Sequence, residues 1–135
     1  MSLHLLLVED NPSDVELLCT AFEELKIEAI FTIFRAGDEA IWGIRQIGRN
    51  SEKIPNLAFL DLNMPRASGR EVLASIRQQP IFETMPVLVF STSNHPVDRQ
   101  QCLAAGASDY LVKPPHFYEL LRLIGDIQER WLKPF

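Results

Sequence analysis

Acids, hydroxyls and one lysine stand where short apolar runs of this sequence end. The acids are Glu9, Asp10 and Asp61, the hydroxyls are Ser91 and Thr92, and the lysine is Lys113. Asp61 is the most informative, because it directly follows the apolar run LAFL. Burying a lone carboxylate is costly unless a cation or hydrogen bonds compensate it. An acid in this position indicates a polar pocket just beyond a buried strand.

These residue types suit one kind of chemistry. Clustered carboxylates raise one another's pKa unless a cation joins them. Oxygen donors without His or Cys favour Mg²⁺ over zinc, and Mg²⁺ readily binds phosphate oxygens. A lysine adds a second positive charge, and a hydroxyl can donate to a phosphoryl oxygen. A carboxylate nucleophile, a metal, an ammonium and a hydroxyl are the groups needed for phosphoryl transfer to an aspartate.

Each residue also has an ordinary interpretation. Glu9 and Asp10 can form a turn that caps a helix, and Asp61 can begin a turn before Asn-Met-Pro. Lys113 can be a surface lysine, and the hydroxyls can satisfy backbone groups at a strand end. Four such coincidences at the same end of successive strands are much less expected than a shared site.

The elements that position these residues alternate along the chain. Short apolar runs bounded by turn residues predict strands, as buried parallel strands require. They are 3–8, 29–34, 56–60, 86–90 and 109–112. Amphipathic stretches between them predict five helices. They begin at Pro12 with Asn11 as cap, near Asp38, after Ser68-Gly69, near Pro96 and near His116.

This alternation favours a parallel sheet with helices on both faces and a ligand site beyond the carboxyl ends of the strands. The fourth helix, about 96–105, has a thin apolar stripe, whereas the fifth, about 116–132, is strongly apolar on one side. We expect the polar connection 48–56 to be an exposed loop. We also expect one domain, residues 1–135, with a short tail at 133–135 and no output domain.

Composition narrows the class of protein. The 135 residues carry 13 Lys and Arg against 18 Asp and Glu, a formal net charge of −5. This balance disfavours direct nucleic-acid binding. The apolar start lacks the features of a signal peptide, and we expect no membrane span. Cys19 and Cys102 have no metal-binding or redox spacing, so we expect small core residues in a reducing cytoplasm.

Four segments together resemble a response-regulator receiver domain. They are LLLVEDNPSD, FLDLNMPRASG, VLVFSTS and AAGASDYLVKP. Ser91 lies 30 positions after Asp61, and Lys113 lies 52 after it, which are spacings common in that family. The resemblance implies an α/β, flavodoxin-like (CheY-like) fold with five parallel strands in the order 2-1-3-4-5 and five helices on both faces.

The resemblance also implies residue roles. Asp61 would be the phosphoacceptor, taking its phosphoryl group from a phosphohistidine of a sensor histidine kinase. Asp10, Asp61 and the backbone carbonyl of Asn63 would bind Mg²⁺, with Glu9 assisting indirectly. Lys113 would pair with Asp61 and then with the phosphoryl oxygens.

A conformational switch is implied in the same way. Ser91, with Thr92 beside it, would move to hydrogen-bond the phosphoryl group, and Tyr110 would follow inward. The Lys113–Pro114 peptide bond would be cis. Because the fourth helix has little apolar surface to hold it, we expect the face of helix 4, strand 5 and helix 5 to change.

A narrower resemblance is to the single-domain regulators that partner bacterial and cyanobacterial phytochromes. The terminal aromatic residues and the long 48–56 connection carry it. It implies a phytochrome as a candidate kinase and a homodimer formed through helix 4, strand 5, helix 5 and the tail. The interface candidates are Tyr110, Phe117, Trp131 and Phe135, although Trp131 and Phe135 can equally close their own core.

Other functions remain open at this point. A phosphorelay intermediate and a chemotaxis-like regulator share the same site. An aspartyl-phosphate phosphatase usually carries a second aspartate two residues after the nucleophile, where this chain has Asn63. A degenerate receiver that only binds partners would not need the intact acids. We therefore expect a cytoplasmic phosphoacceptor, not an enzyme that turns over small substrates.

Overall fold

The computed structural model describes residues 3–50 and 54–133. Within them, five parallel strands form one sheet in the order β2-β1-β3-β4-β5, which confirms the predicted topology. The strands are β1 (Leu3–Val8), β2 (Ala29–Phe34), β3 (Leu57–Leu60), β4 (Val87–Ser91) and β5 (Asp109–Val112). The boundaries differ from the predicted ones by one residue at most.

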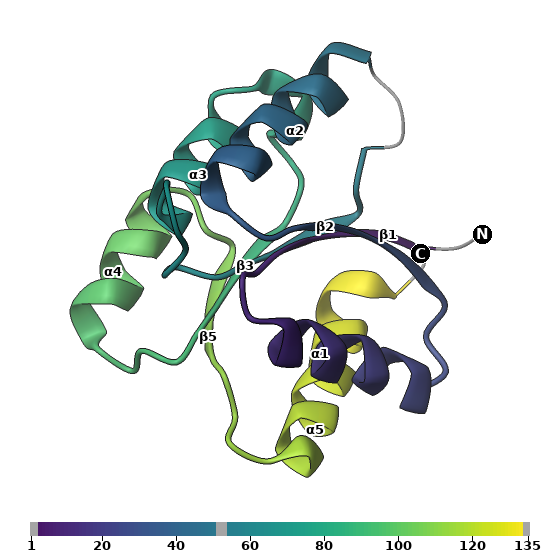
Figure 1. The fold of residues 1–135 in the computed structure, drawn as a ribbon. Coiled ribbons are helices and arrows are strands. Elements are labelled where there is room, and N and C mark those ends of the chain that lie inside the picture. Colours follow the sequence, from purple (N-terminus) through teal and green to yellow (C-terminus); the bar gives the residue numbers. More distant parts are fainter. Residues whose placement is uncertain (1–2, 51–53, 134–135) are drawn as a thin grey trace.

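Helices cover both faces of the sheet. Figure 1 shows α1 and α5 on one side and α2, α3 and α4 on the other. Their bounds are α1 (Pro12–Glu24), α2 (Gly37–Asn50), α3 (Gly69–Arg77), α4 (Pro96–Ala104) and α5 (Phe117–Ile127). A 3₁₀ turn, η1 (Pro80–Phe82), was not predicted, and a π-helical turn, η2 (Gln128–Leu132), extends α5 to the predicted end.

Local signals start two of the helices. The Asn11 side chain accepts hydrogen bonds from the backbone N–H groups of Ser13 and Asp14, and Pro12 occupies the first helical position of α1. Ser68 and Glu71 form a capping box at the start of α3. Both helices therefore begin at the edge where β1 and β3 end.

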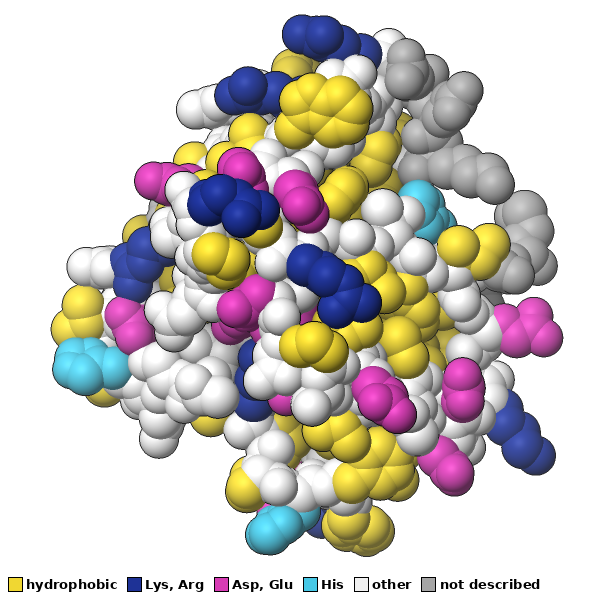
Figure 2. Space-filling model, in the orientation of Figure 1, with side chains coloured by type: hydrophobic (Ala, Val, Ile, Leu, Met, Phe, Trp, Pro, Cys, Tyr) yellow, Lys and Arg dark blue, Asp and Glu magenta, His cyan; other side chains and the backbone are white. Residues whose placement is uncertain are grey.

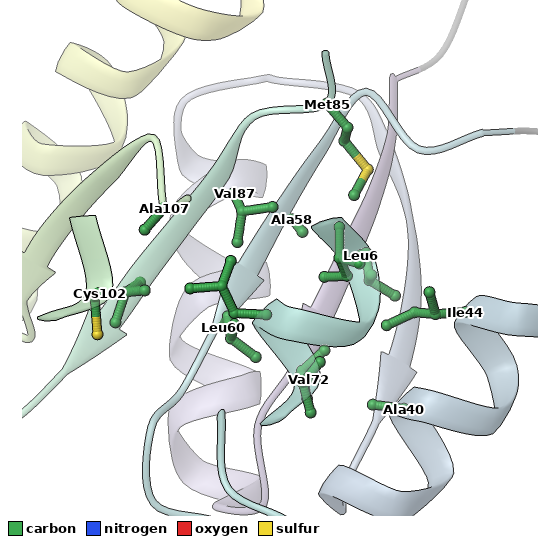
Figure 3. Packing of buried hydrophobic residues seen from close by; sticks show 14 of the residues in the cluster. Leu6, Ala40, Ile44, Ala58, Leu60, Val72, Met85, Val87, Cys102 and Ala107 are labelled. Carbon is green, nitrogen blue, oxygen red and sulfur yellow. The ribbon is translucent and has the colours of Figure 1, made fainter. Parts of the chain in front are cut away.

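Two hydrophobic clusters separate the sheet from its helices. Figure 3 shows the cluster between the sheet and α2 and α3, where Leu6 and Leu60 approach Val72 of α3 and Ile44 of α2. On the opposite face, α1 and α5 pack on side chains that include Phe59. All four residues of β3 are buried, which is why this strand reads as continuously apolar.

The predicted 48–56 loop is wrong at its start, because α2 continues to Asn50. A Cβ atom on Gly48 would lie 2.3 Å from the side-chain oxygen of Gln79, so the last turn of α2 packs closely against this side chain. Residues 51–53 lie outside the described residues. Beyond them Ile54 is exposed and Pro55 is buried.

Both cysteines, predicted as small core residues, are at least half-buried. Acidic and basic side chains are interspersed on the face shown in Figure 2. Cys102 is buried and Cys19 is half-buried, and both are free thiols. Among the described residues, no helix combines the length and apolar character needed to cross a bilayer.

Candidate functional site

Three carboxylates meet where the central strands end. Glu9 and Asp10 follow β1 and Asp61 follows β3, and one oxygen of each lies within 4.8 Å of the others. The side chains of Glu9 and Asp61 are buried, whereas Asp10 is exposed. The cluster thus combines two acids sheltered from water with one that opens to solvent.

The parallel sheet places these residues by extending its hydrogen bonds just past the strands. The backbone N–H of Asp61 donates to the carbonyl of Val8 over 2.9 Å, which ties the end of β3 to that of β1. The N–H of Lys113 donates to the carbonyl of Ser91 over 2.7 Å, tying the ends of β5 and β4. The side chains therefore leave the same edge of the sheet.

Gly69 brings the first turn of α3 against the acidic loop. Its N–H donates to the carbonyl of Leu62 over 2.9 Å. A Cβ atom at this position would lie 2.1 Å from the carbonyl oxygen of Asp61, a distance that no side chain can occupy. Glycine is required here for close packing, so the helix start fixes the backbone of the acid.

Lys113 contacts three carboxylates. Its Nζ forms ion pairs with Glu9 and with Asp14, the latter at 2.8 Å, and lies 3.7 Å from Asp61. Asp14 was not predicted as a site residue. The available signal was its position in the first turn of α1, which begins directly after Glu9, Asp10 and the cap Asn11.

Burial dominates the electrostatics of the cluster. It raises the pKa of Glu9 to about 7, although the hydrogen bond from Lys113 opposes this change. Burial also raises the pKa of Asp61, and the charge of Lys113 again opposes it. For Lys113, burial alone would lower the pKa, but hydrogen bonds to Asp14 and Glu9 raise it above its usual value. Lys113 therefore stays protonated. A second cation beside Glu9 and Asp61 would stabilise their ionised forms.

The donor set suits a hard divalent cation. The three grouped side chains, Glu9, Asp10 and Asp61, offer carboxylate oxygens alone. Oxygen ligands of this kind favour Mg²⁺ or Mn²⁺ over zinc. Asn63, whose carbonyl the resemblance assigns to the metal, is exposed on the loop that follows Asp61.

The predicted switch residues lie at the ends of β4 and in β5. Ser91 is fully buried, and its Oγ accepts the N–H of Ser93 over 3.1 Å, while Thr92 is exposed. Tyr110 is 4% exposed and its hydroxyl donates to the carbonyl of Ser93 over 2.8 Å. Its ring already lies inward and is therefore not presented on the surface as an interface residue.

The other interface candidates differ in position. Phe117 and Trp131 are half-buried and pack against the cluster that holds α5 to the sheet. Phe135 lies outside the described residues.

The prediction of a cis Lys113–Pro114 bond is wrong, because the described residues contain no cis peptide bond. The trans form of an X–Pro bond is favoured by only about 0.5–1 kcal/mol, so a motif alone does not determine the isomer.

A family model of the response regulator receiver domain matches residues 5–125, nearly the whole sheet and its helices. The chain belongs to this family. The receiver is 35% identical over 131 residues to "Response regulator Rcp1" of Synechocystis sp., covering 96% of this chain and 88% of Rcp1.

Solved structures give the same result. The crystal structure of the phosphorylated cyanobacterial phytochrome response regulator RcpA matches with a TM-score of 0.88 and 33% identity, over 98% of this chain and 96% of that one. The Mn²⁺-bound form of Rcp1 matches with a TM-score of 0.84 and 33% identity, with the same coverage. The predicted family, the fold and the likeness to phytochrome response regulators are confirmed.

Proposed function

We propose that this receiver accepts a phosphoryl group on Asp61 from a phosphohistidine of a sensor histidine kinase. One observation carries the proposal. Asp61 is a sheltered carboxylate at the carboxyl edge of the sheet, grouped with Glu9 and Asp10 and 3.7 Å from the ammonium of Lys113. A nucleophile, acidic metal ligands and a fixed cation thus share one small site.

Phosphoryl transfer to Asp61 forms one bond to phosphorus and breaks another. A carboxylate oxygen of Asp61 forms a P–O bond while the P–N bond of the phosphohistidine breaks, and the leaving imidazole takes up a proton from solvent. Lys113 offsets the negative charge on the phosphoryl oxygens. Glu9 and Asp14 contribute by holding the lysine beside Asp61.

Mg²⁺ is the cofactor that the site fits best. Asp10, Asp61 and the backbone carbonyl of Asn63 would hold it, with Glu9 assisting indirectly. A bound cation would offset the negative charge of these carboxylates and of the incoming phosphoryl group. The all-oxygen donor set supports this assignment, as does the Mn²⁺-bound structure of Rcp1.

Phosphorylation would then change the face formed by α4, β5 and α5. The phosphoryl oxygens accept a hydrogen bond from the Ser91 hydroxyl, and Thr92 and Tyr110 adjust with the loop that links β4 to α4. Of the described side chains of α4, Cys102 alone is buried, so this helix costs least to displace. The receiver would act as a phosphoacceptor that binds partners, not as an enzyme on other substrates.

The likeness to Rcp1 and RcpA supports a phytochrome as the kinase and a cytoplasmic location. It also supports a homodimer formed through α4, β5, α5 and the tail, with Phe117, Trp131 and Phe135 as contact candidates. Sedimentation at rising concentration, with and without phosphorylation, tests the dimer, and a monomer under all conditions would reject it.

Acetyl phosphate with Mg²⁺ tests the phosphoacceptor directly. We expect mass spectrometry to show one hydroxylamine-labile phosphoryl group in the wild type and none in Asp61→Asn. Asp126→Asn, at an exposed aspartate of α5, is the matched control and should label normally. Unchanged labelling of Asp61→Asn would refute the assignment. Phosphotransfer from phytochrome kinases under red and far-red light then tests the partner.

A further inference from the structure

One residue holds the loop that follows the predicted switch serine. The backbone N–H of Ser93 donates to Oγ of Ser91 over 3.1 Å, and its carbonyl accepts the hydroxyl of Tyr110 over 2.8 Å. The hydroxyl of Ser93 donates to Oδ2 of Asp98, in the first turn of α4, over 2.5 Å. The N–H, the carbonyl and the side chain of Ser93 are thus each engaged.

Asp98 continues this chain of contacts to α3. Its other oxygen, Oδ1, accepts a hydrogen bond from Arg70 over 2.7 Å, and Arg70 also contacts Gln101. Figure 1 shows α4 beside α3 on the same side of the sheet. A continuous polar path therefore runs from α3 through Asp98 and Ser93 to the hydroxyl of Ser91.

The hydrogen bond from Ser93 holds the Ser91 hydroxyl in place but leaves the hydrogen of that hydroxyl free to be donated. A serine hydroxyl has one donor hydrogen and two acceptor lone pairs. Because Oγ of Ser91 accepts the N–H of Ser93, its position is set while the hydrogen remains able to point at another acceptor. Asp61 directly follows the neighbouring strand β3, so the phosphoryl oxygens would lie on that side.

We propose that Asp98, held by Arg70 and acting through Ser93, is a positioning residue that aims the Ser91 hydroxyl at the phosphoryl group on Asp61. The inference rests on the proposed phosphoacceptor function and adds Arg70, Ser93 and Asp98, which lie outside the acidic site.

The path suits a positioning role better than a stabilising one. The side chains of Arg70 and Asp98 are 38% and 32% exposed, and ion pairs so exposed contribute little to global stability. The hydrogen bond from a hydroxyl to a carboxylate is in contrast short and strong. Removing Asp98 should therefore leave the fold intact and release the side chain of Ser93.

The first test needs no phosphoryl group. Hydrogen exchange at the backbone amide of Ser93, followed by NMR, reports its bond to Ser91. We expect exchange about tenfold faster in Asp98→Ala and an intermediate rate in Asp98→Asn, whose amide oxygen still accepts from Ser93. Glu129→Ala, which removes an exposed ion pair with Lys133, is the control and should match the wild type. An unchanged rate in Asp98→Ala overturns the inference.

The second test is a double-mutant cycle on the rate of labelling by acetyl phosphate with Mg²⁺. We expect Asp98→Ala to slow labelling about fivefold, and to cause no further loss when Ser91 is already alanine. A merely structural role would make the two losses multiply, and that result overturns the inference alone. Absence of labelling in the wild type would overturn the proposed function as well, so the two failures are distinguishable.

Discussion

The helices α4 and α5 flank β5 but are held by different forces. α5 buries Leu120, Ile124 and Ile127 against the sheet and α1. Of the described side chains of α4, Cys102 alone is buried, and the helix is tied to the molecule by the polar contacts of Asp98 and Arg99. One helix depends on apolar area and the other on hydrogen-bond geometry.

This difference indicates which of the two helices should move when a phosphoryl group adds negative charge nearby. Apolar burial is insensitive to charge, so α5 provides a fixed base. The polar contacts of α4 begin two residues beyond Ser91, next to the acidic site. We therefore expect phosphorylation at Asp61 to shift α4 relative to α5 without unfolding either helix.

Truncating a buried side chain should lower the free energy of unfolding much more in α5 than in α4. Ile124→Ala in α5 should lower the free energy of unfolding by about 3 kcal/mol, because it leaves a cavity in a fully buried position. Cys102→Ala in α4 removes one sulfur atom and should cost about 1 kcal/mol. Urea unfolding of both variants measures this, and equal losses would contradict the contrast between the helices.

The acidic site should depend strongly on its lysine. Lys113→Met removes the ammonium that faces Glu9 and Asp61, leaving buried carboxylates without their cation. Without divalent cation at alkaline pH, we expect a loss of about 2–3 kcal/mol in the free energy of unfolding. Lys133→Met, at an exposed ion pair, is the control and should cost less than about 0.5 kcal/mol. A similar cost for both lysines would reject the assigned role of Lys113.

The same site predicts a pH dependence of the metal-free protein. The folded state raises the pKa of Glu9 from 4.5 to about 7, so between these values it holds a proton that the unfolded chain releases. The stability gained from this bound proton is fully present below the pKa of Glu9 in the unfolded chain. It is lost as the pH rises through the pKa of Glu9 in the folded protein. We expect the free energy of unfolding to fall by at most about 3 kcal/mol across this range in the presence of a chelator.

Glu9→Gln removes the titrating group and should flatten most of that slope. Urea unfolding at a series of pH values compares the two proteins. A variant with the slope of the wild type would show that Glu9 is not its source.

Removing a polar contact of α4 should change the free energy of unfolding least. Arg70→Ala should change the free energy of unfolding by less than about 0.5 kcal/mol, because its ion pair with Asp98 is exposed. The same variant should loosen the loop that follows β4. A loss above about 2 kcal/mol would show that polar contacts stabilise α4 as much as apolar area stabilises α5.

The sequence predicted the fold well because its signals are local and agree with one another. The strands are short apolar runs between turn residues, and the cap of α1 follows from Asn11 and Pro12. The convergence of Glu9, Asp10, Asp61 and Lys113 follows from parallel topology, since each residue stands at a carboxyl end.

The parts that were missed depend on contacts between distant segments. The ion pair of Asp14 with Lys113 and the contact of Arg70 with Asp98 join residues far apart in sequence. The position of Asp14 in the first turn of α1 points to the acidic edge but does not identify Lys113 as its partner, and the contact of Arg70 with Asp98 has no sequence pattern. The last turn of α2 lies beside the Gln79 side chain and continues to Asn50, whereas the local polarity of the sequence predicted a loop there. The prolyl isomer depends on a small energy difference that tertiary contacts decide.

Titration with Mn²⁺, followed by NMR, tests the central claim that the carboxyl edge of the sheet gathers a divalent cation beside Asp61. Paramagnetic broadening should appear first at the backbone amides of residues 9–11 and 61–63, and Mg²⁺ should reverse it. Asp10→Asn should abolish this broadening at the same concentration. Broadening that begins elsewhere, or that survives in Asp10→Asn, would contradict the account.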